Sequence, residues 1–429
     1  MKRVRASLTF FAGDEALTGA GRYVVAICPL VFFREITVSA KRIIFITAYN
    51  PRDVSKWSGT PSSIFQALTD NSQDVEIKPL RGGLGILNLA ARILNKALYY
   101  LGIELDCRFS TAYAMLAGAY LTIRLLFVGR GAVLGIAASN LLPYVMTTRD
   151  IIYVSDGTFR LICELYPAFK KFPKWLQAQG DGNEARTLSI SRFIIYPSEW
   201  ARNSAQTDYK VPNDRIFQLP FGPNIPDRII SGHFRRKVIA QYSEITLLFV
   251  SADWKRKNGD MVIDICRVLI SAGAKVRAIL IGDTPEYVRE LDFVEDRGFL
   301  RKSDPMQLAR LCEAYSEAHF LLLPTIADAS PIVFSEAQAF GVPPITFDVG
   351  GAASSVVHRE TGLLLPLGAP AERFAEEILR YVENPSLYDE LSERCHSWYV
   401  RKANWSKWSI LILNLARYGR DATPALSPS

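Results

Sequence analysis

The 429-residue sequence has little of what marks secreted or metal-binding chains. It contains six cysteines, and no two of them stand at C-x-x-C spacing, which argues against a disulfide framework and against a zinc site. The four histidines share no metal-ligand spacing with these cysteines. We therefore expect reduced, buried thiols, as in a protein of the cytoplasm.

Long hydrophobic runs are also missing, and none near the N-terminus reaches the length of about 20 residues that a bilayer-spanning helix needs. The apolar run at 23–33 follows several basic residues. The triplet Val38-Ser39-Ala40 resembles a signal-peptide cleavage site, but Arg34 and Glu35 interrupt the approach to it. We expect residues 1–40 to form an irregular extension, and a membrane-contacting segment is the alternative.

Charge is present but unevenly placed. The net charge is +7, and the excess of Lys and Arg lies in the first 230 residues. No cluster of basic residues with interleaved aromatics occurs, so we expect no nucleic-acid partner. The basic N-terminal half instead favours peripheral contact with an anionic membrane surface, or an acceptor that bears phosphate.

The first half of the chain follows an α/β pattern. A continuous apolar run at 42–47 predicts a parallel strand buried on both faces, and Thr60-Pro61 opens a helix, because proline is favoured in the first turn. Apolar residues recur at helical spacing over 92–128, which we interpret as packed helices rather than a membrane span, since Arg108 and Arg124 interrupt the run. Further strands are expected at 132–138, 151–154, 193–196 and 216–219.

A second α/β unit follows a linker between residues 220 and 232, which is rich in proline and glycine. Its expected strands lie at 245–250, 276–282, 320–324 and 344–347, and its expected helices at 261–272, 305–315 and 334–341. We predict an α/β protein of two domains, 41–225 and 240–395. Because ligands bind beyond the carboxyl ends of parallel strands, the site should lie in the cleft between the two sheets.

One segment of the second unit carries most of the chemistry. A buried strand ends at Pro324, a loop carries Asp328, and a helix that begins near Pro331 carries Glu336. The unpaired N–H groups of a first helical turn form a phosphate site. The two carboxylates flank this turn, where they can accept hydrogen bonds from sugar hydroxyls on either side of a diphosphate. The alternative is an N-cap Asp followed by a Glu that faces solvent.

The same segment resembles the Glu-x7-Glu signature of the retaining, GT-B-fold glycosyltransferases of family 4. The resemblance covers roughly residues 41–418 and implies two Rossmann-like domains with parallel sheets facing across a cleft, with a C-terminal helix at 396–420 that crosses back to the first domain. It implies that Glu336 holds the ribose hydroxyls and that Asp328 holds the donor sugar. Asp328 is one methylene shorter than the usual Glu. The amides assigned to the donor are those of Ser330, Ile332 and Val333.

A basic loop at 251–259 also resembles the family pattern. Lys257 stands at the position of the Lys that neutralises the leaving diphosphate. The usual Arg position, near Ala252, is vacant, so Arg256 is the candidate substitute. The alternative is a solvated basic loop.

Two further stretches resemble donor-binding backbone. Trp57-Ser58-Gly59-Thr60 is similar to the glycine loop that approaches the diphosphate, where a side chain at Gly59 would block that approach. Its alternative is a simple turn before a helix. Gly298-Phe299-Leu300 is similar to the segment whose backbone reads the base, and its alternative is a plain strand edge. Asp348-Val349-Gly350-Gly351 matches the family's closing stretch of the domain.

On the acceptor side, Asp156 follows a buried strand in Ser155-Asp156-Gly157. By resemblance it faces the acceptor, and a helix cap is the alternative. Ser198 is expected to be an N-cap.

The implied activity is that of a hexosyltransferase, which moves a sugar with retention from a nucleotide-diphosphate sugar to a saccharide or lipid-linked acceptor, in polysaccharide or glycoconjugate biosynthesis. The nucleotide sugar is a co-substrate, and no cofactor is expected. No Asp-x-Asp triplet occurs, so the usual metal motif of the other major glycosyltransferase fold is absent and we expect metal independence. The alternatives are a glycan phosphorylase or sugar-nucleotide epimerase on the same fold, and a non-catalytic nucleotide-sugar-binding homologue. The expected location is the cytoplasm, and the alternative is peripheral attachment to the inner face of the membrane.

Overall fold

The computed structural model describes residues 42–80, 84–240 and 243–418. All of them belong to one compact unit of the chain. The expected extension at 1–40, with its cleavage-like triplet and Cys28, lies outside the described residues.

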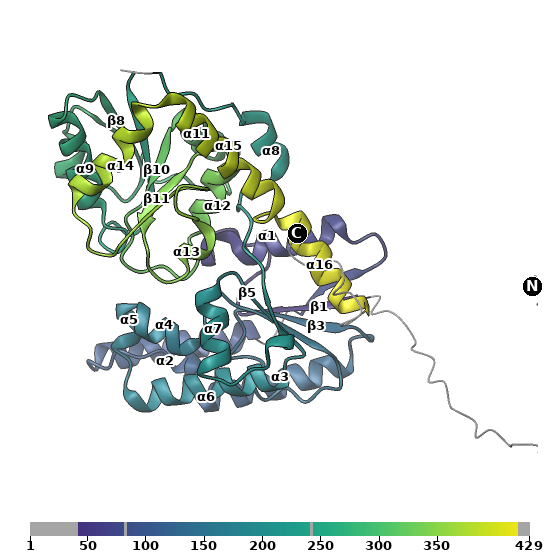
Figure 1. Cartoon of the computed structure of the whole chain (residues 1–429). Helices are drawn as coiled ribbons and strands as arrows, with labels where there is room; N and C mark the ends of the chain where they lie inside the picture. The colour runs from purple at the N-terminus through teal and green to yellow at the C-terminus, as the bar shows by residue number, and fades with distance from the viewer. Residues whose placement is uncertain (1–41, 81–83, 241–242, 419–429) are drawn as a thin grey trace, which may run out of the picture. The chain divides into compact units, whose positions relative to one another are not determined.

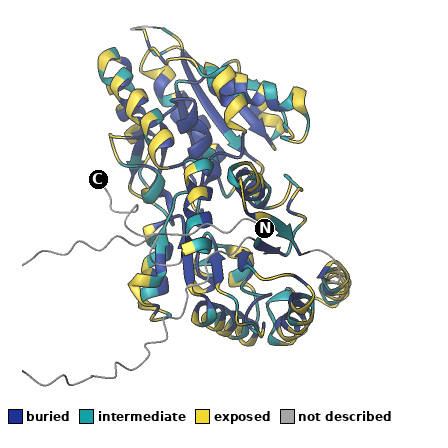
Figure 2. Ribbon diagram, turned by 90° about the vertical axis from the view of Figure 1, so that its right-hand side faces the viewer, coloured by how far each residue is buried: buried dark blue, intermediate teal, exposed yellow. Residues whose placement is uncertain are grey.

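The first of two parallel sheets has six strands in the order β2-β1-β3-β4-β5-β6. They are β1 (Arg42–Thr47), β2 (Glu76–Pro79), β3 (Ala132–Ile136), β4 (Ile151–Val154), β5 (Phe193–Tyr196) and β6 (Ile216–Gln218). Every neighbouring pair is parallel. The four central strands are almost wholly buried (Figure 2), as continuous apolar runs predict for strands covered on both faces.

Helices cover both faces of this sheet. They are α1 (Thr60–Asn71), α2 (Leu84–Tyr100), α3 (Thr111–Leu126), α4 (Phe159–Leu165), α5 (Pro167–Lys170), α6 (Lys174–Ile190) and α7 (Glu199–Thr207). Successive side chains of a strand point to opposite faces, so Ile43 packs with α1 while Ile44 packs with α2 and α3. Short 3-10 turns lie at Trp57–Gly59, Cys107–Phe109 and Asn213–Arg215.

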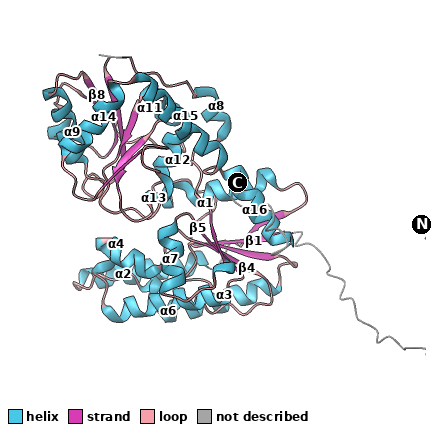
Figure 3. Cartoon of the chain, viewed as in Figure 1, coloured by secondary structure: helices cyan, strands magenta, loops and turns pink. Residues whose placement is uncertain are grey.

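The second sheet has six strands in the order β12-β11-β10-β7-β8-β9. They are β7 (Ile245–Ser251), β8 (Val276–Gly282), β9 (Val294–Asp296), β10 (Phe320–Leu322), β11 (Pro344–Phe347) and β12 (Leu363–Leu365). Its helices are α9 (Gly259–Ser271), α10 (Glu286–Arg289), α11 (Pro305–Glu317), α12 (Ile332–Ala339), α13 (Ala352–Ser355), α14 (Ala371–Val382) and α15 (Pro385–Arg401). The sheet is sandwiched between α9 with α14 on one side and α11 with α12 on the other (Figures 1 and 3).

The predicted α/β class with two parallel sheets is confirmed. Several boundaries differ by one or more residues. Three strands end earlier than expected, β3 at Ile136, β6 at Gln218 and β10 at Leu322, and β7 extends to Ser251. The helices expected at 261–272, 305–315 and 334–341 are α9, α11 and α12, whose bounds are given above. The interpretation of 220–232 as linker was wrong in its second half, where the chain forms α8 (Asp227–His233). The acidic Asp227 in the first turn favours a helix start there, because a carboxylate is stabilised at the positive end of the helix dipole.

The last described helix, α16 (Trp405–Tyr418), lies beside α1 (Figure 1). The Asn71 side-chain amide donates to the Ser409 hydroxyl at 3.0 Å, and the Trp405 ring stacks on Phe221 with ring centroids 5.5 Å apart. The chain therefore ends its described part against the core of the first sheet.

Five cysteines lie in the described part, and all five are free. Cys266, Cys312 and Cys395 are buried as expected, whereas Cys107 and Cys163 are half-buried. In residues 42–80, 84–240 and 243–418, no helix combines the length and the apolar character that crossing a membrane requires.

Candidate active site

A pocket of about 520 Å³ collects residues from both sheets at the carboxyl ends of their strands. Ten of the twelve predicted site residues line it: Asp156, Arg256, Lys257, Phe299, Leu300, Asp328, Ser330, Ile332, Val333 and Glu336. The other two, Gly59 and Gly298, each stand next to a lining residue in the chain. Residues that were predicted from separate sequence motifs therefore lie together in one pocket.

Asp328 lies in the loop after β10 and is almost fully buried. Its carboxylate contacts the ammonium group of Lys257, which the loop after β7 supplies. Burial and the adjacent Arg256 lower the pKa of Lys257 well below its usual range, whereas the opposite charge of Asp253 works against this shift. Asp328 is not the N-cap of α12, because that position belongs to Pro331.

Arg256 contacts the loop after β10 next to Asp328. Its guanidinium group donates to the Ala327 carbonyl at 2.8 Å and stands 3.9 Å from the Asp328 carboxylate. It also lies 5.8 Å from the ring centre of Tyr166. The alternative of a solvated basic loop therefore fails for both Arg256 and Lys257, and of the three basic residues in the loop only Lys255 is exposed.

Glu336 sits in the second turn of α12 with no exposed surface, so the alternative of a solvent-facing Glu was wrong. One carboxylate oxygen accepts from the Asn224 amide at 3.2 Å and contacts the ammonium group of Lys302. The other accepts from the Tyr315 hydroxyl at 3.1 Å. Its burial is therefore matched by three donors.

The N-terminus of α12 points its first turn at the pocket, where Ser330, Ile332 and Val333 form part of the lining. Pro331 precedes the helix and offers no side-chain cap. Because the first N–H groups of a helix lack intrahelical partners, they are available to an anion in the pocket.

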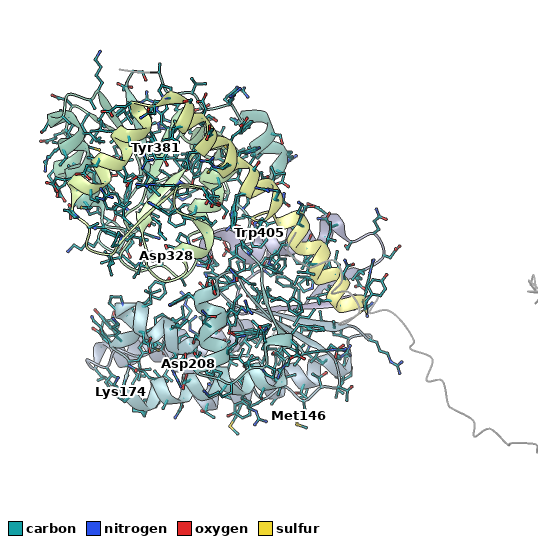
Figure 4. All side chains as sticks on the ribbon, viewed as in Figure 1. Met146, Lys174, Asp208, Asp328, Tyr381 and Trp405 are labelled. Carbon is teal, nitrogen blue, oxygen red and sulfur yellow. The ribbon has the colours of Figure 1, made fainter. Side chains whose placement is uncertain are left out.

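Two glycines, Gly350 and Gly351, pack closely against the backbone of the loop that carries Asp328. Gly350 has φ +56°, and a β-carbon there would come within 2.1 Å of the Asp328 carbonyl oxygen. A β-carbon on Gly351 would meet the Ala329 carbonyl oxygen at the same distance. The closing stretch recognised in the sequence thus acts as a backbone support for the loop, and Figure 4 shows Asp328 at the edge of the lobe built on the second sheet.

The glycine loop forms a 3-10 turn ahead of α1, with Gly59 at φ +91° as the N-cap. A β-carbon on Gly59 would lie 3.1 Å from the Val54 carbonyl oxygen. Asn224 ties the loop to α12, since its side chain donates to the Ser58 carbonyl at 2.8 Å while its backbone amide donates to the Glu336 carboxylate at 3.2 Å.

The segment at 298–300 follows β9, which ends at Asp296, so it is not a plain strand edge. Gly298 turns the chain with φ +65°, its amide donates to the Asp296 carboxylate at 3.1 Å, and its carbonyl accepts from the Gly282 amide at 3.0 Å. This anchoring leaves Phe299 and Leu300 at the pocket wall.

Asp156 lies at the first-sheet side of the pocket, where the Trp57 indole N–H donates to its carboxylate at 3.0 Å. Burial raises the pKa of Asp156 above its usual range, and the hydrogen bond from Trp57 acts in the opposite direction. The alternative of a helix cap was wrong, because Thr158 caps α4. Ser198 caps α7, as predicted, by accepting from the Ala201 amide at 3.2 Å.

Four pocket or contact residues escaped the sequence reasoning: Lys302, Tyr315, Asn224 and Tyr166. Lys302 was within reach, because it follows the 298–300 segment by two residues and is basic. The others carry no local signal: the Tyr166 hydroxyl, for instance, accepts from the Ala329 amide, 163 residues away along the chain. Across the described ranges, no group of three or more His, Cys, Asp or Glu side chains could hold a metal ion.

Comparison with known proteins identifies the fold, and it matches part of the chain to a family. Residues 233–398 match the family model of glycosyl transferases group 1. The whole described fold is that of the GT-B glycosyltransferases, to which the similar solved structures belong. Sucrose-phosphate synthase from Thermosynechococcus elongatus has a TM-score of 0.59 at 15% identity, covering 87% of this chain and 97% of that one.

Two further comparisons are more specific. The Anabaena protein HepE, solved in complex with UDP and glucose, has a TM-score of 0.54 at 14% identity and covers 86% of this chain and 98% of its own. The capsular polysaccharide biosynthesis glycosyltransferase CapM of Staphylococcus aureus is 28% identical over 261 residues, which is 57% of this chain and 64% of CapM. The chain spans less than two thirds of the length of the curated relatives it matches.

Proposed function

We propose that this protein is a retaining, metal-independent glycosyltransferase of family 4. It moves a hexosyl group from a nucleotide-diphosphate sugar to a saccharide or lipid-linked acceptor. One observation carries the proposal: two carboxylates, two cations and the first turn of α12 converge on one pocket of a GT-B fold. The UDP and glucose bound to HepE support the class of donor, and CapM supports a role in polysaccharide or glycoconjugate biosynthesis.

Glu336 is assigned to the ribose hydroxyls. A carboxylate offers about four acceptor sites, and Asn224, Lys302 and Tyr315 use three of them. Two neighbouring hydroxyls need two sites, so one of these donors must give way. Lys302 is the partner with freedom to move, because its side chain is one-fifth exposed while Glu336 is fully buried.

The diphosphate is assigned to Lys257, Arg256 and the first-turn amides of α12. During transfer the bond from the anomeric carbon to the diphosphate oxygen breaks, and the acceptor oxygen bonds to the same carbon. The acceptor proton passes to the departing diphosphate on the same face, which retains the anomeric configuration. Positive groups already aimed at the leaving oxygen lower the barrier, because they need no reorganisation as its charge grows.

Asp156 is assigned to the acceptor. Its carboxylate lines the pocket opposite the donor residues, and Trp57 fixes one of its oxygens. The backbone amides of Asp156 and Gly157 also hydrogen-bond this carboxylate. A carboxylate offers about four acceptor sites, so it can still accept a hydrogen bond from an acceptor hydroxyl, which would orient that hydroxyl toward the anomeric carbon. The location proposed with this activity is the cytoplasm, with peripheral contact to the inner face of the membrane.

A thermal-shift screen with UDP-, GDP- and ADP-sugars tests the donor site first, since a ligand that binds only the folded state raises its stability. Glu336→Gln should remove most of this shift and lower turnover at least about tenfold, whereas the exposed Glu313→Gln should match the wild type. A Glu336→Gln variant with wild-type turnover would remove the ribose assignment.

Product analysis completes the test. NMR of the new glycosidic bond reports whether the donor configuration is retained, and turnover should be unchanged by a chelator. Product formed only with an acceptor separates a transferase from an epimerase. Donor binding without turnover on any acceptor would indicate a binding protein instead.

A further inference from the structure

The outward face of α2 is left uncovered in the described chain. Of its 17 residues only Leu84 and Ala91 are buried, although most of the helix is apolar. Ile86 is 76% exposed and Ile93 is 63% exposed. The interpretation of this region as fully packed helices therefore holds for one side of the helix only.

The exposed residues form a stripe. Ile86, Leu89 and Ile93 recur at spacings of three and four, which places them on one face of a helix that turns about 100° per residue. Leu84 and Ala91 lie on the opposite face and pack toward the first sheet. The helix thus has two apolar faces, and the fold uses one of them.

Helix α3 repeats this arrangement beside α2. Ala117, Leu121 and Leu125 face the core, while residues such as Ile123 and Leu126 face outward. The two helices are neighbours on one side of the first sheet (Figure 1), and the Tyr113 hydroxyl donates to the Asn88 side chain at 2.6 Å between them.

Met146 joins the same surface, because its amide donates to the Thr122 hydroxyl of α3 at 2.9 Å, and Figure 4 shows its side chain projecting outward. We call the combined surface the outer apolar face. It consists of Ile86, Leu89, Ile93, Tyr100, Met115, Leu116, Ile123, Leu126, Phe127 and Met146. Single exposed apolar residues are ordinary, but a cluster over two adjacent helices marks an interaction surface.

The charges on this surface are all of one sign. Neither α2 nor α3 contains Asp or Glu, and their only charged residues are Arg92, Lys96 and Arg124. Arg92 and Lys96 are exposed and flank the apolar stripe of α2. Two acidic residues stand in the connection between the helices, and Lys171 and Arg108 pair with them.

We propose that the outer apolar face docks this protein on an anionic lipid bilayer. The apolar side chains would enter the boundary between headgroups and acyl chains, and Arg92 and Lys96 would lie beside anionic headgroups. A helix of 17 residues with a buried second face lies on the membrane surface rather than crossing it. A second copy of the chain fits less well, because symmetric pairing would place two basic surfaces that lack acidic residues against each other.

The outer apolar face would be the surface through which the protein makes the peripheral membrane contact proposed above. This docking rests on the proposed function in one respect, which is that a lipid-linked acceptor would be met at this membrane. Vesicle binding needs neither donor nor turnover, so the two proposals can fail independently.

Flotation with lipid vesicles tests the surface. The full chain should float with vesicles of equimolar phosphatidylcholine and phosphatidylglycerol, and less with phosphatidylcholine alone. Added salt should weaken the binding, because it screens the attraction to anionic headgroups.

Two double variants separate the contributions. Ile86→Glu with Ile93→Glu should weaken binding to the mixed vesicles at least about tenfold, since the buried apolar area is lost. Arg92→Gln with Lys96→Gln should weaken it about fivefold for each charge removed. Matched controls on α9, the exposed Ile270→Glu and Arg267→Gln, should bind like the wild type.

All these positions are exposed, so the variants should keep the wild-type circular dichroism and the donor-induced thermal shift. Absence of wild-type binding to the mixed vesicles, or equal binding by the double isoleucine variant, would overturn the proposal. The proposal would also be overturned if light scattering showed a wild-type dimer that the double isoleucine variant dissociates, while the wild type bound no vesicles. A chain that binds vesicles but no nucleotide sugar would leave the surface standing and remove the proposed activity.

Discussion

The ammonium group of Lys257 contacts the carboxylate of Asp328, and only 11% and 10% of the two side chains are exposed. The two residues come from loops that follow different strands of the second sheet, β7 and β10. In the unliganded chain each charge is the other's partner. A donor diphosphate would compete with Asp328 for Lys257, so donor binding should rearrange this pair.

Replacing Asp328 by asparagine should separate nucleotide binding from transfer. With the carboxylate gone, Lys257 loses the counter-ion that it contacts while Arg256 keeps Asp253, and we expect the free nucleoside diphosphate to bind several-fold more tightly. Transfer should fall at least about tenfold, because the proposed contact to the donor sugar is lost. Calorimetry with the nucleotide chosen by the thermal-shift screen and a turnover assay measure the two effects. The exposed Asp264→Asn is the control, and unchanged or weaker nucleotide binding by Asp328→Asn would contradict the competition.

Lys302 should act as a competitor of the ribose. In Lys302→Met the carboxylate of Glu336 keeps Tyr315 and Asn224 but loses its ammonium partner. We expect a lower dissociation constant for the donor, and a loss of roughly 3–5 kcal/mol in the unliganded stability, since a buried charge is left without its counter-ion. Titration calorimetry and urea unfolding report these effects. A donor that binds more weakly to this variant would show that Lys302 contributes to binding instead.

The support of the Asp328 loop by Gly350 can be tested against a glycine with a similar backbone. Gly350→Ala and Gly368→Ala both place a side chain at positive φ, which costs roughly 1–2 kcal/mol of stability in each case. Only the first also drives a β-carbon into the Asp328 carbonyl, because nothing lies within 4 Å of the position on Gly368. Donor affinity should therefore drop about tenfold or more in Gly350→Ala alone. Equal affinities in the two variants would mean that the loop tolerates the displacement.

Glu184 should make stability depend on pH. Its buried carboxylate accepts from the Tyr153 hydroxyl at 3.2 Å and the Tyr196 hydroxyl at 3.3 Å, and burial raises its pKa to about 7. In an unfolded chain the pKa is about 4.3. Between these values the folded state keeps a proton that the unfolded state has lost, so the free energy of unfolding falls as pH rises through this window.

The decrease should end near pH 7 and total roughly 3 kcal/mol. Glu184→Gln does not titrate, so its stability relative to the wild type should grow from about pH 4.5 to about pH 7 and then level off. Urea unfolding at a series of pH values gives this difference. If the stability difference between Glu184→Gln and the wild type stayed constant over this pH range, the Glu184 carboxyl would be ionised in the folded state across the range.

Most of the site could be predicted because its residues stand next to strand ends and helix starts that short stretches of sequence reveal. Asp328 and Glu336 flank a strand end and a helix start, and Lys257 follows another strand end of the same kind. The carboxyl ends of parallel strands meet at one edge of a sheet, so residues at such ends converge without further information. Lys302 and Asn224 escaped because their importance lies in contacts with Glu336, which are 34 and 112 residues distant in the chain.

The sequence by itself determined the two parallel α/β sheets and most of the charged groups at the pocket, because buried strands, helix starts and their flanking polar residues follow short local patterns. Only the tertiary structure decided which of these groups pair. It placed Lys257 against Asp328, buried Glu336 where a solvent-facing residue was an alternative, and formed α8 within the expected linker. It also left one face of α2 uncovered, since apolar periodicity shows that a helix has such a face but not whether the fold covers it.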